Sequence, residues 1–345
     1  RESGGKGVNQ KQENEDMNTA KDMDALAAAV RDGSRRATAR AITIIESTRD
    51  EHRDMAEALL TILLPVSGKS IRVGVSGVPG VGKSTFIEAF GLYIIGRGHR
   101  VAVLAVDPSS KVSGGSILGD KTRMEVLGRD PAAFIRPTPA GGTLGGVARR
   151  TREAMIVCEA AGYDVVLVET VGVGQSETAV KDMTDIFMLL LLPSGGDELQ
   201  GMKKGIVELA DIILVNKTDG DLAAAARHAA SDYRSALQFL RPTTPNWTVP
   251  VETCSALTGV GIAEAWDTVL AFQKALSAED ALGARRVEQA RAWLWNEIGD
   301  TLLSTLKAHD AIREIAPALE DQVAQGTITP SMAAQRMLWK FLGDG

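Results

Sequence analysis

A glycine-rich stretch at residues 77–85 combines the residue types that bind phosphate. It consists of Gly77, Val78, Pro79, Gly80, Val81, Gly82, Lys83, Ser84 and Thr85. Glycines let the backbone turn its N–H groups toward an anion, and a following helix adds the partial positive charge of its N-terminus. Lys83 would bind the β- and γ-phosphate oxygens, and the Ser84 hydroxyl would bind Mg²⁺. The alternative is a glycine-rich turn without a ligand, but the complete spacing favours a nucleoside triphosphate site.

The segments around this stretch predict the elements that position it. Residues 71–76 form a short apolar run typical of a buried strand, and the residues after Lys83 begin a helical pattern. From there apolar runs alternate with helical patterns, which predicts an α/β domain with a mostly parallel sheet flanked by helices. The predicted strands are residues 71–76, 101–106, 134–137, 164–169, 186–192, 212–215 and 249–253.

Two later loops indicate that the base is guanine. Asn216-Lys217-Thr218-Asp219 follows a buried strand and matches the Asn-Lys-x-Asp element of GTPases. The Asp219 carboxylate can accept hydrogen bonds from guanine N1 and N2, a pair of donors that adenine lacks. We expect Asn216 at the other edge of the ring and the Lys217 stem across its face. Ser255, Ala256 and Leu257 match the loop whose backbone N–H meets guanine O6. Together with the phosphate motif, these loops predict GTP and GDP as ligands.

Two carboxylates end predicted strands on the phosphate side. Asp107 follows residues 101–106, and Glu169 ends residues 164–169, with Gly172 shortly after it. Ligands of open α/β sheets bind outside the carboxyl ends of the strands, so both acids are expected near Mg²⁺ and the attacking water. Either acid could instead cap a helix or face solvent. Val173 stands where Ras-like enzymes carry a water-orienting glutamine, which predicts slow intrinsic hydrolysis.

Lys203 and Lys204 could supply positive charge to the phosphates, although a solvated helix face is the simpler interpretation.

The histidines are scattered without metal-ligand spacing, so we expect no transition-metal site. The two cysteines, Cys158 and Cys254, lie in apolar segments and are expected to be buried thiols in a reducing, cytoplasmic environment.

Composition narrows the class of partner. The chain has 345 residues and a formal net charge of −6, which argues against a nucleic-acid partner. Its longest apolar run, residues 186–192, is too short to span a bilayer, so no membrane partner is expected.

The expected organisation has an N-terminal and a C-terminal helical part around the nucleotide domain. Residues 1–16 are polar and are expected to be a tag or disordered, with Met17 as the natural start. Residues 17–66 read as a helical segment, residues 67–275 as the P-loop GTPase domain and residues 276–345 as a helical region. An apolar stripe between Leu282 and Leu306 is typical of a core, but part of it could face another subunit.

The combined motifs resemble the MeaB/ArgK family of P-loop GTPases. The resemblance rests on residues 77–85, 106–110, 169–177 and 216–219, of which residues 169–177 are specific to the family. It implies a GTPase chaperone of adenosylcobalamin-dependent methylmalonyl-CoA mutase, and a homodimer joined through the C-terminal helices. It also implies switch segments near residues 107–123, 169–181 and 192–203, with Asp107 and Glu169 at the metal and Lys203 as an activator.

Two other functions compete with this resemblance. A metal-insertion GTPase for nickel enzymes shares the P-loop class, but it normally carries a metal site rich in His or Cys. A small-molecule kinase needs an acceptor pocket that the sequence does not reveal.

Overall fold

The computed structural model describes residues 21–47, 49–106, 124–137, 144–170, 176–193, 204–239, 244–277 and 280–343. The chain divides into two compact units, residues 1–286 and residues 287–345. Within the described residues no helix is both long and apolar enough to cross a membrane.

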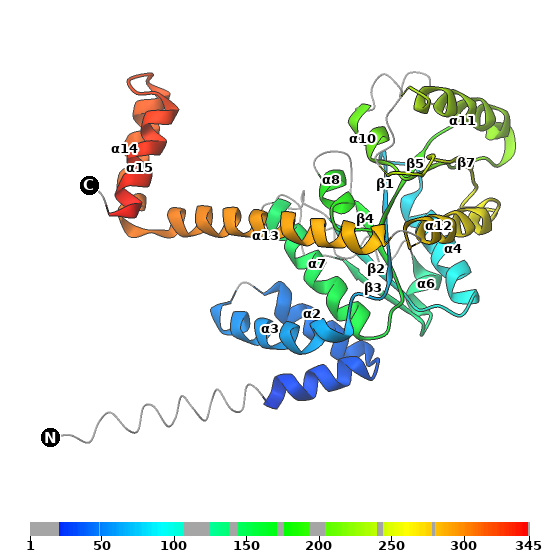
Figure 1. Ribbon diagram of the computed structural model, residues 1–345, viewed down its shortest axis with the longest axis horizontal. Coiled ribbons are helices and arrows are strands. Elements are labelled where there is room, and N and C mark those ends of the chain that lie inside the picture. Colours follow the sequence, from blue (N-terminus) through cyan, green and yellow to red (C-terminus); the bar gives the residue numbers. More distant parts are fainter. Residues whose placement is uncertain are drawn as a thin grey trace. The chain divides into compact units, whose positions relative to one another are not determined.

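The described part of the first unit contains a seven-stranded parallel sheet in the order β3-β2-β4-β1-β5-β6-β7 (Figure 1). The expected α/β fold is therefore confirmed. Residues 101–106, 186–191 and 212–215 of this sheet are continuous apolar runs, because parallel sheets are covered by helices on both faces. The strands are β1 Ile71–Gly77, β2 Val101–Val106, β3 Ala133–Pro137, β4 Val165–Thr170, β5 Ile186–Leu191, β6 Ile212–Val215 and β7 Val251–Thr253.

Two buried hydrophobic clusters lie on the two faces of this sheet. One contains side chains of the N-terminal helices, which pack on α7. The helices that contribute side chains to this first cluster are residues 21–31, α2 Arg35–Glu46, α3 Asp50–Leu63, α7 Leu144–Ala160, α8 Ser176–Lys181, α10 Lys204–Leu209 and α11 Ala223–Leu237. The opposite cluster involves α4 Lys83–Gly96, α6 Glu125–Arg129 and α12 Ile262–Ser277.

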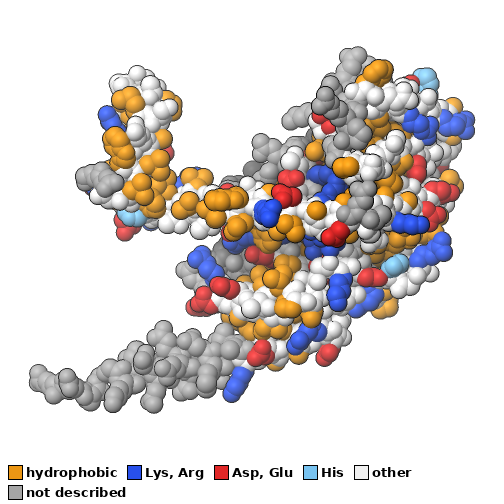
Figure 2. Space-filling model, viewed as in Figure 1, with side chains coloured by type: hydrophobic (Ala, Val, Ile, Leu, Met, Phe, Trp, Pro, Cys, Tyr) orange, Lys and Arg blue, Asp and Glu red, His pale blue; other side chains and the backbone are white. Residues whose placement is uncertain are grey.

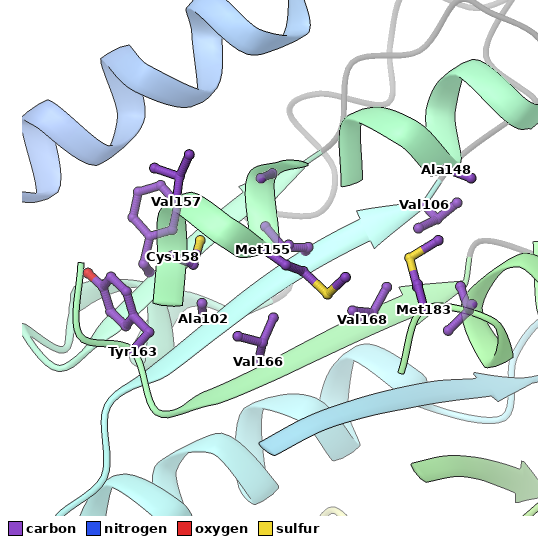
Figure 3. Close-up of a cluster of buried hydrophobic side chains, with 14 of the residues drawn as sticks. Ala102, Val106, Ala148, Met155, Val157, Cys158, Tyr163, Val166, Val168 and Met183 are labelled. Carbon is purple, nitrogen blue, oxygen red and sulfur yellow. The ribbon is translucent and has the colours of Figure 1, made fainter. Parts of the chain in front are cut away.

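The two cysteines are free buried thiols, as predicted. Cys158 of α7 lies with Met155 above Ala102 and Val166 of the sheet (Figure 3). Cys254 belongs to the cluster on the opposite face. Burial raises the pKa of Cys254 to about 12 and also raises that of Cys158. Both thiols therefore remain protonated in the folded protein at neutral pH.

Several strand ends differ from the prediction by one residue, and two larger differences have a physical reason. The glycine pairs at residues 141–142 and 145–146 predict a loop before a helix that starts at residue 147, but α7 begins at Leu144 and includes Gly145 and Gly146. Contacts of α7 with the sheet outweigh their low helix propensity. β7 begins at Val251 rather than at Val249, since Pro250 has no N–H to donate to a ladder.

The second unit is helical where the structure describes it. It contains the greater part of α13 Ala281–Ala308, together with α14 Asp310–Ala324 and α15 Pro330–Leu342. The last two helices form a hairpin that buries Ile312, Leu319 and Ala333. In contrast, α13 has no buried residue. Its apolar stripe is therefore largely exposed within this chain.

Candidate functional site

The stretch that is predicted to bind phosphate, residues 77–85, connects β1 to α4 at the carboxyl edge of the sheet. Gly80 and Gly82 have φ values of 82° and 93°, a left-handed conformation that favours glycine. At Gly77 a Cβ atom would lie 2.6 Å from the Leu190 carbonyl oxygen of β5, so the loop passes too close to the sheet for a side chain. Lys83 begins α4, and its Nζ donates to the carbonyl oxygen of Gly77 at 2.7 Å. These features give the loop the backbone form that phosphate binding requires.

Gly82→Ala tests this backbone directly. The added Cβ would lie 3.0 Å from Asn216 Nδ2 and would also strain the positive φ. We expect the affinity for GDP, measured by calorimetry, to fall about tenfold or more. The control is Gly96→Ala at the end of α4, where a Cβ meets no atom within 4 Å. Unchanged GDP affinity in Gly82→Ala would show that this backbone form is not needed.

Ser84 and Glu169 meet beside the loop. The register pairs Val75 of β1 with Glu169 of β4, which places Glu169 near the start of the phosphate loop. The Ser84 hydroxyl donates to Glu169 Oε1 at 3.3 Å, and Glu169 is 4% exposed. A hydroxyl and a carboxylate oxygen are ligands that Mg²⁺ prefers, so this pair fits the expected metal position.

Glu177, a buried acid that was not predicted as a site residue, affects the pKa of Lys83. Burial lowers the pKa of Lys83, while the charges of Glu169 and Glu177 oppose this shift. Glu177 lies in the first turn of α8 and is 1% exposed. The sequence signal that could have identified Glu177 is its position at the end of the 169–177 motif. Its proximity to Lys83, however, depends on the tertiary fold.

A second pair links the neighbouring strand ends. The Thr170 hydroxyl donates to Ser76 Oγ at 2.8 Å, and both side chains are buried. Thr170 follows Glu169 and Ser76 precedes the phosphate loop, so the pair fixes the two strand ends against each other.

The two guanine-type loops contact each other and the phosphate loop. Asn216 is buried, donates from Nδ2 to the Val81 carbonyl at 2.9 Å, and accepts from Ala256 N at 3.1 Å. Lys217 has a φ of 60° and donates to the Gly80 carbonyl at 2.7 Å. The Asn-Lys-x-Asp loop, residues 216–219, is therefore attached to the phosphate loop by the side chains of Asn216 and Lys217. Strain at Lys217 is typical of a position fixed by function.

Asp219 is positioned by Ser255. The Ser255 hydroxyl donates to Asp219 Oδ1 at 2.6 Å and also accepts from the Thr258 N–H at 3.2 Å. Asp219 is the side chain proposed to accept hydrogen bonds from guanine, and Oδ2 is its second carboxylate oxygen. Leu257 is 79% exposed, next to these residues in the chain. The structure thus brings together the Asn-Lys-x-Asp loop and the Ser-Ala loop.

Three predicted site residues lie outside the described residues: Asp107, Gly172 and Lys203. The proposed roles of Asp107 and Lys203 in catalysis, and of Gly172 in nucleotide binding, remain predictions. Among the described residues no group of three His, Cys, Asp or Glu could hold a metal ion.

The parallel sheet, the phosphate loop and the attached guanine-type loops define a P-loop GTPase. The family described as "Methylmalonyl Co-A mutase-associated GTPase MeaB" matches residues 38–311, and the chain belongs to this family.

Similar proteins support the assignment. A mouse protein described as "Methylmalonic aciduria type A homolog, mitochondrial" is 49% identical over 92% of this chain and 79% of its own. The Escherichia coli protein "GTPase ArgK" is 51% identical over 81% of this chain and 85% of its own. A crystal structure of a "LAO/AO transport system kinase" has a TM-score of 0.75 and 39% identity, over 93% of this chain and 97% of that one. The chain is therefore a GTP-hydrolysing enzyme of the MeaB family.

Proposed function

We propose that this GTPase is a chaperone of adenosylcobalamin-dependent methylmalonyl-CoA mutase, and that its nucleotide state controls cofactor loading of the mutase. The observation that carries the proposal is the family match over residues 38–311, in a family whose description names the mutase. The mouse relative, named for methylmalonic aciduria, supports the same pathway. A kinase function, as in the name of the similar crystal structure, explains the Asn216–Asp219 loop less well, because that loop is suited to guanine.

The proposed chemistry assigns one task to each group. Lys83 stabilises charge on the transferring phosphoryl group, and Asp219 selects guanine. Ser84 and Glu169, together with Asp107, would hold Mg²⁺, which supplies charge neutralisation at the phosphate oxygens. Lys203 would add a further positive charge. Because Val173 replaces the glutamine of Ras-like enzymes, hydrolysis is expected to be slow until a partner completes the site.

A partner that binds one nucleotide state more tightly must shift the equilibrium between the states, so hydrolysis becomes a timed release signal. Purified methylmalonyl-CoA mutase should therefore raise GTP turnover about tenfold or more. It should also co-elute with this chain in a nucleotide-dependent complex. Lys203→Ala should reduce the stimulated rate and leave GDP affinity unchanged. Neither stimulation nor a complex in any nucleotide state would refute the chaperone function, while the GTPase assignment would stand.

We also propose that the protein is a homodimer joined through its C-terminal helices. Hydrophobic side chains gather over the α14–α15 hairpin (Figure 2). The exposed fractions of Trp295 and Leu302 on α13 are 71% and 58%, and that of Trp339 on α15 is 53%. Exposed apolar surface of this kind typically marks a protein interface.

Charge placed on this surface should separate the subunits. The double variant Trp295→Asp and Leu302→Asp is expected to be monomeric by light scattering, because a buried unpaired carboxylate is costly. The control is Asp300→Ala, at an exposed polar position of the same helix, which should leave the dimer intact. A dimeric double variant would place the interface elsewhere.

A further inference from the structure

One buried aspartate contacts cations from two distant parts of the chain. Asp211 lies immediately before β6, and its side chain has no exposed surface. It pairs with Lys181, the last residue of α8, and with Arg285 near the start of α13, where Nη2 lies 3.5 Å from Oδ1. The side chains of Lys181 and Arg285 are themselves 12% and 18% exposed.

Neutral donors hold the Asp211 carboxylate in place. Phe187 N donates to Oδ2 at 2.8 Å, and the Thr244 hydroxyl donates to Oδ1 at 3.0 Å. Trp247 Nε1 also donates to the Asp211 carbonyl oxygen at 2.8 Å. An acid this buried needs a compensating positive charge, so Lys181 and Arg285 share the task of neutralising it.

Lys181 belongs to α8, a helix whose first turn lies close to the proposed nucleotide site. α8 starts at Ser176, shortly after Glu169 and Thr170 end β4. Glu177, whose charge acts on Lys83, lies four residues before Lys181, and residues with this spacing share one face of a helix. Burial lowers the pKa of Lys181, Asp211 opposes the shift, and the charge of Arg285 adds to it. The two cations therefore share one carboxylate and repel each other across it.

The Arg285 end attaches the start of α13 to the sheet. Its Nη1 donates to the Asp185 carbonyl, its Nη2 donates to the Thr244 hydroxyl at 2.9 Å, and its guanidinium lies 5.5 Å from the Phe272 ring centroid. The adjacent Arg286 binds a different acid. It makes two hydrogen bonds to the Asp185 carboxylate, at 2.7 and 2.6 Å. Two neighbouring arginines thus attach the same helix through separate carboxylates.

We propose that Asp211 couples the nucleotide site to the start of α13. A nucleotide state that displaces α8 weakens the Lys181 pair and leaves the carboxylate to Arg285, which tightens the attachment of α13. Conversely, loss of Arg285 strengthens the Lys181 pair and favours the nucleotide state in which α8 keeps its present position, because coupling between two sites is reciprocal. This coupling goes beyond the proposed chaperone function and requires no mutase.

The test compares Arg285→Gln with Arg286→Gln in the full-length protein. Calorimetry gives the Kd for GDP and for a non-hydrolysable GTP analogue, each with Mg²⁺, and the ratio of the two is the readout. We expect Arg285→Gln to change this ratio about fivefold or more. The control Arg286→Gln, which loosens the same helix through Asp185, should change it by less than about twofold. Arg285→Lys retains the charge and should retain most of the wild-type ratio.

A Kd ratio within about twofold of wild type in folded Arg285→Gln would overturn the proposal, as would an equal change in Arg286→Gln. Hydrogen exchange on the wild-type protein gives a measurement that does not depend on variants. Amides at the start of α13 should exchange at different rates with GDP and with the GTP analogue. Equal rates in the two states would also overturn the coupling.

Discussion

Asp219→Asn is expected to weaken GTP binding by about 10³-fold or more and to create affinity for xanthosine triphosphate. In the proposed complex the Asp219 carboxylate accepts hydrogen bonds from guanine N1 and N2, and sites built on such pairs reject ligands that cannot form them. An asparagine amide would oppose the guanine N2 donors with its own N–H. With xanthine it accepts from N1 and donates to the C2 carbonyl oxygen. Ser255 can still donate to the amide oxygen, so the loop should keep its form.

Calorimetry with GTP, xanthosine triphosphate and ATP measures this change in base preference. Asp221→Asn is the matched control, since it makes the same substitution at an exposed position close to Asp219. The wild-type protein should bind ATP negligibly. Comparable affinities for ATP and GTP, or no change of preference in Asp219→Asn, would refute guanine selection by this residue.

Lys83→Ala is expected to reduce the single-turnover rate of GTP hydrolysis about 10²-fold or more. Its ammonium is the positive charge that α4 directs toward the loop, and charge placed where negative charge develops lowers the barrier most. In the present structure the lysine donates to the carbonyl oxygens of Gly77 and Val78, so it must exchange these partners for phosphate oxygens.

The matched control for Lys83→Ala is Lys274→Ala, at an exposed position of α12. Rates should be compared at saturating GTP, which separates the chemical step from weaker binding. Hydrolysis by Lys83→Ala at the wild-type rate would remove this lysine from the mechanism.

Local patterns were sufficient to predict much of the fold. β6 was predicted with its observed bounds because residues 212–215 are a continuous apolar run between Asp211 and Asn216. The phosphate motif was equally clear, since its glycines and lysine act within one short stretch. The α7 start was missed because propensity argued against Gly145 and Gly146, while packing on the sheet decided the helix.

Contacts between distant segments could not be predicted from the sequence. The Asn216 amide reaches Val81 across 135 positions of the chain, and Arg285 reaches Asp185 across 100. Sequence spacing carries no information on such pairs without the sheet order that brings them together. The role of Glu177 could not be predicted for the same reason. Its effect on the pKa of Lys83 arises from the placement of α8 rather than from the motif in which it lies.

The two buried thiols give the protein a built-in pair of chemical reporters. Cys158 lies in the cluster covered by α7, and Cys254 lies in the cluster on the other face of the sheet. A thiol reagent can modify each one only when that face opens, and the rate follows the free energy of the local opening. Alkylation followed by mass spectrometry can therefore compare the stability of the two faces in each nucleotide state, without any introduced label.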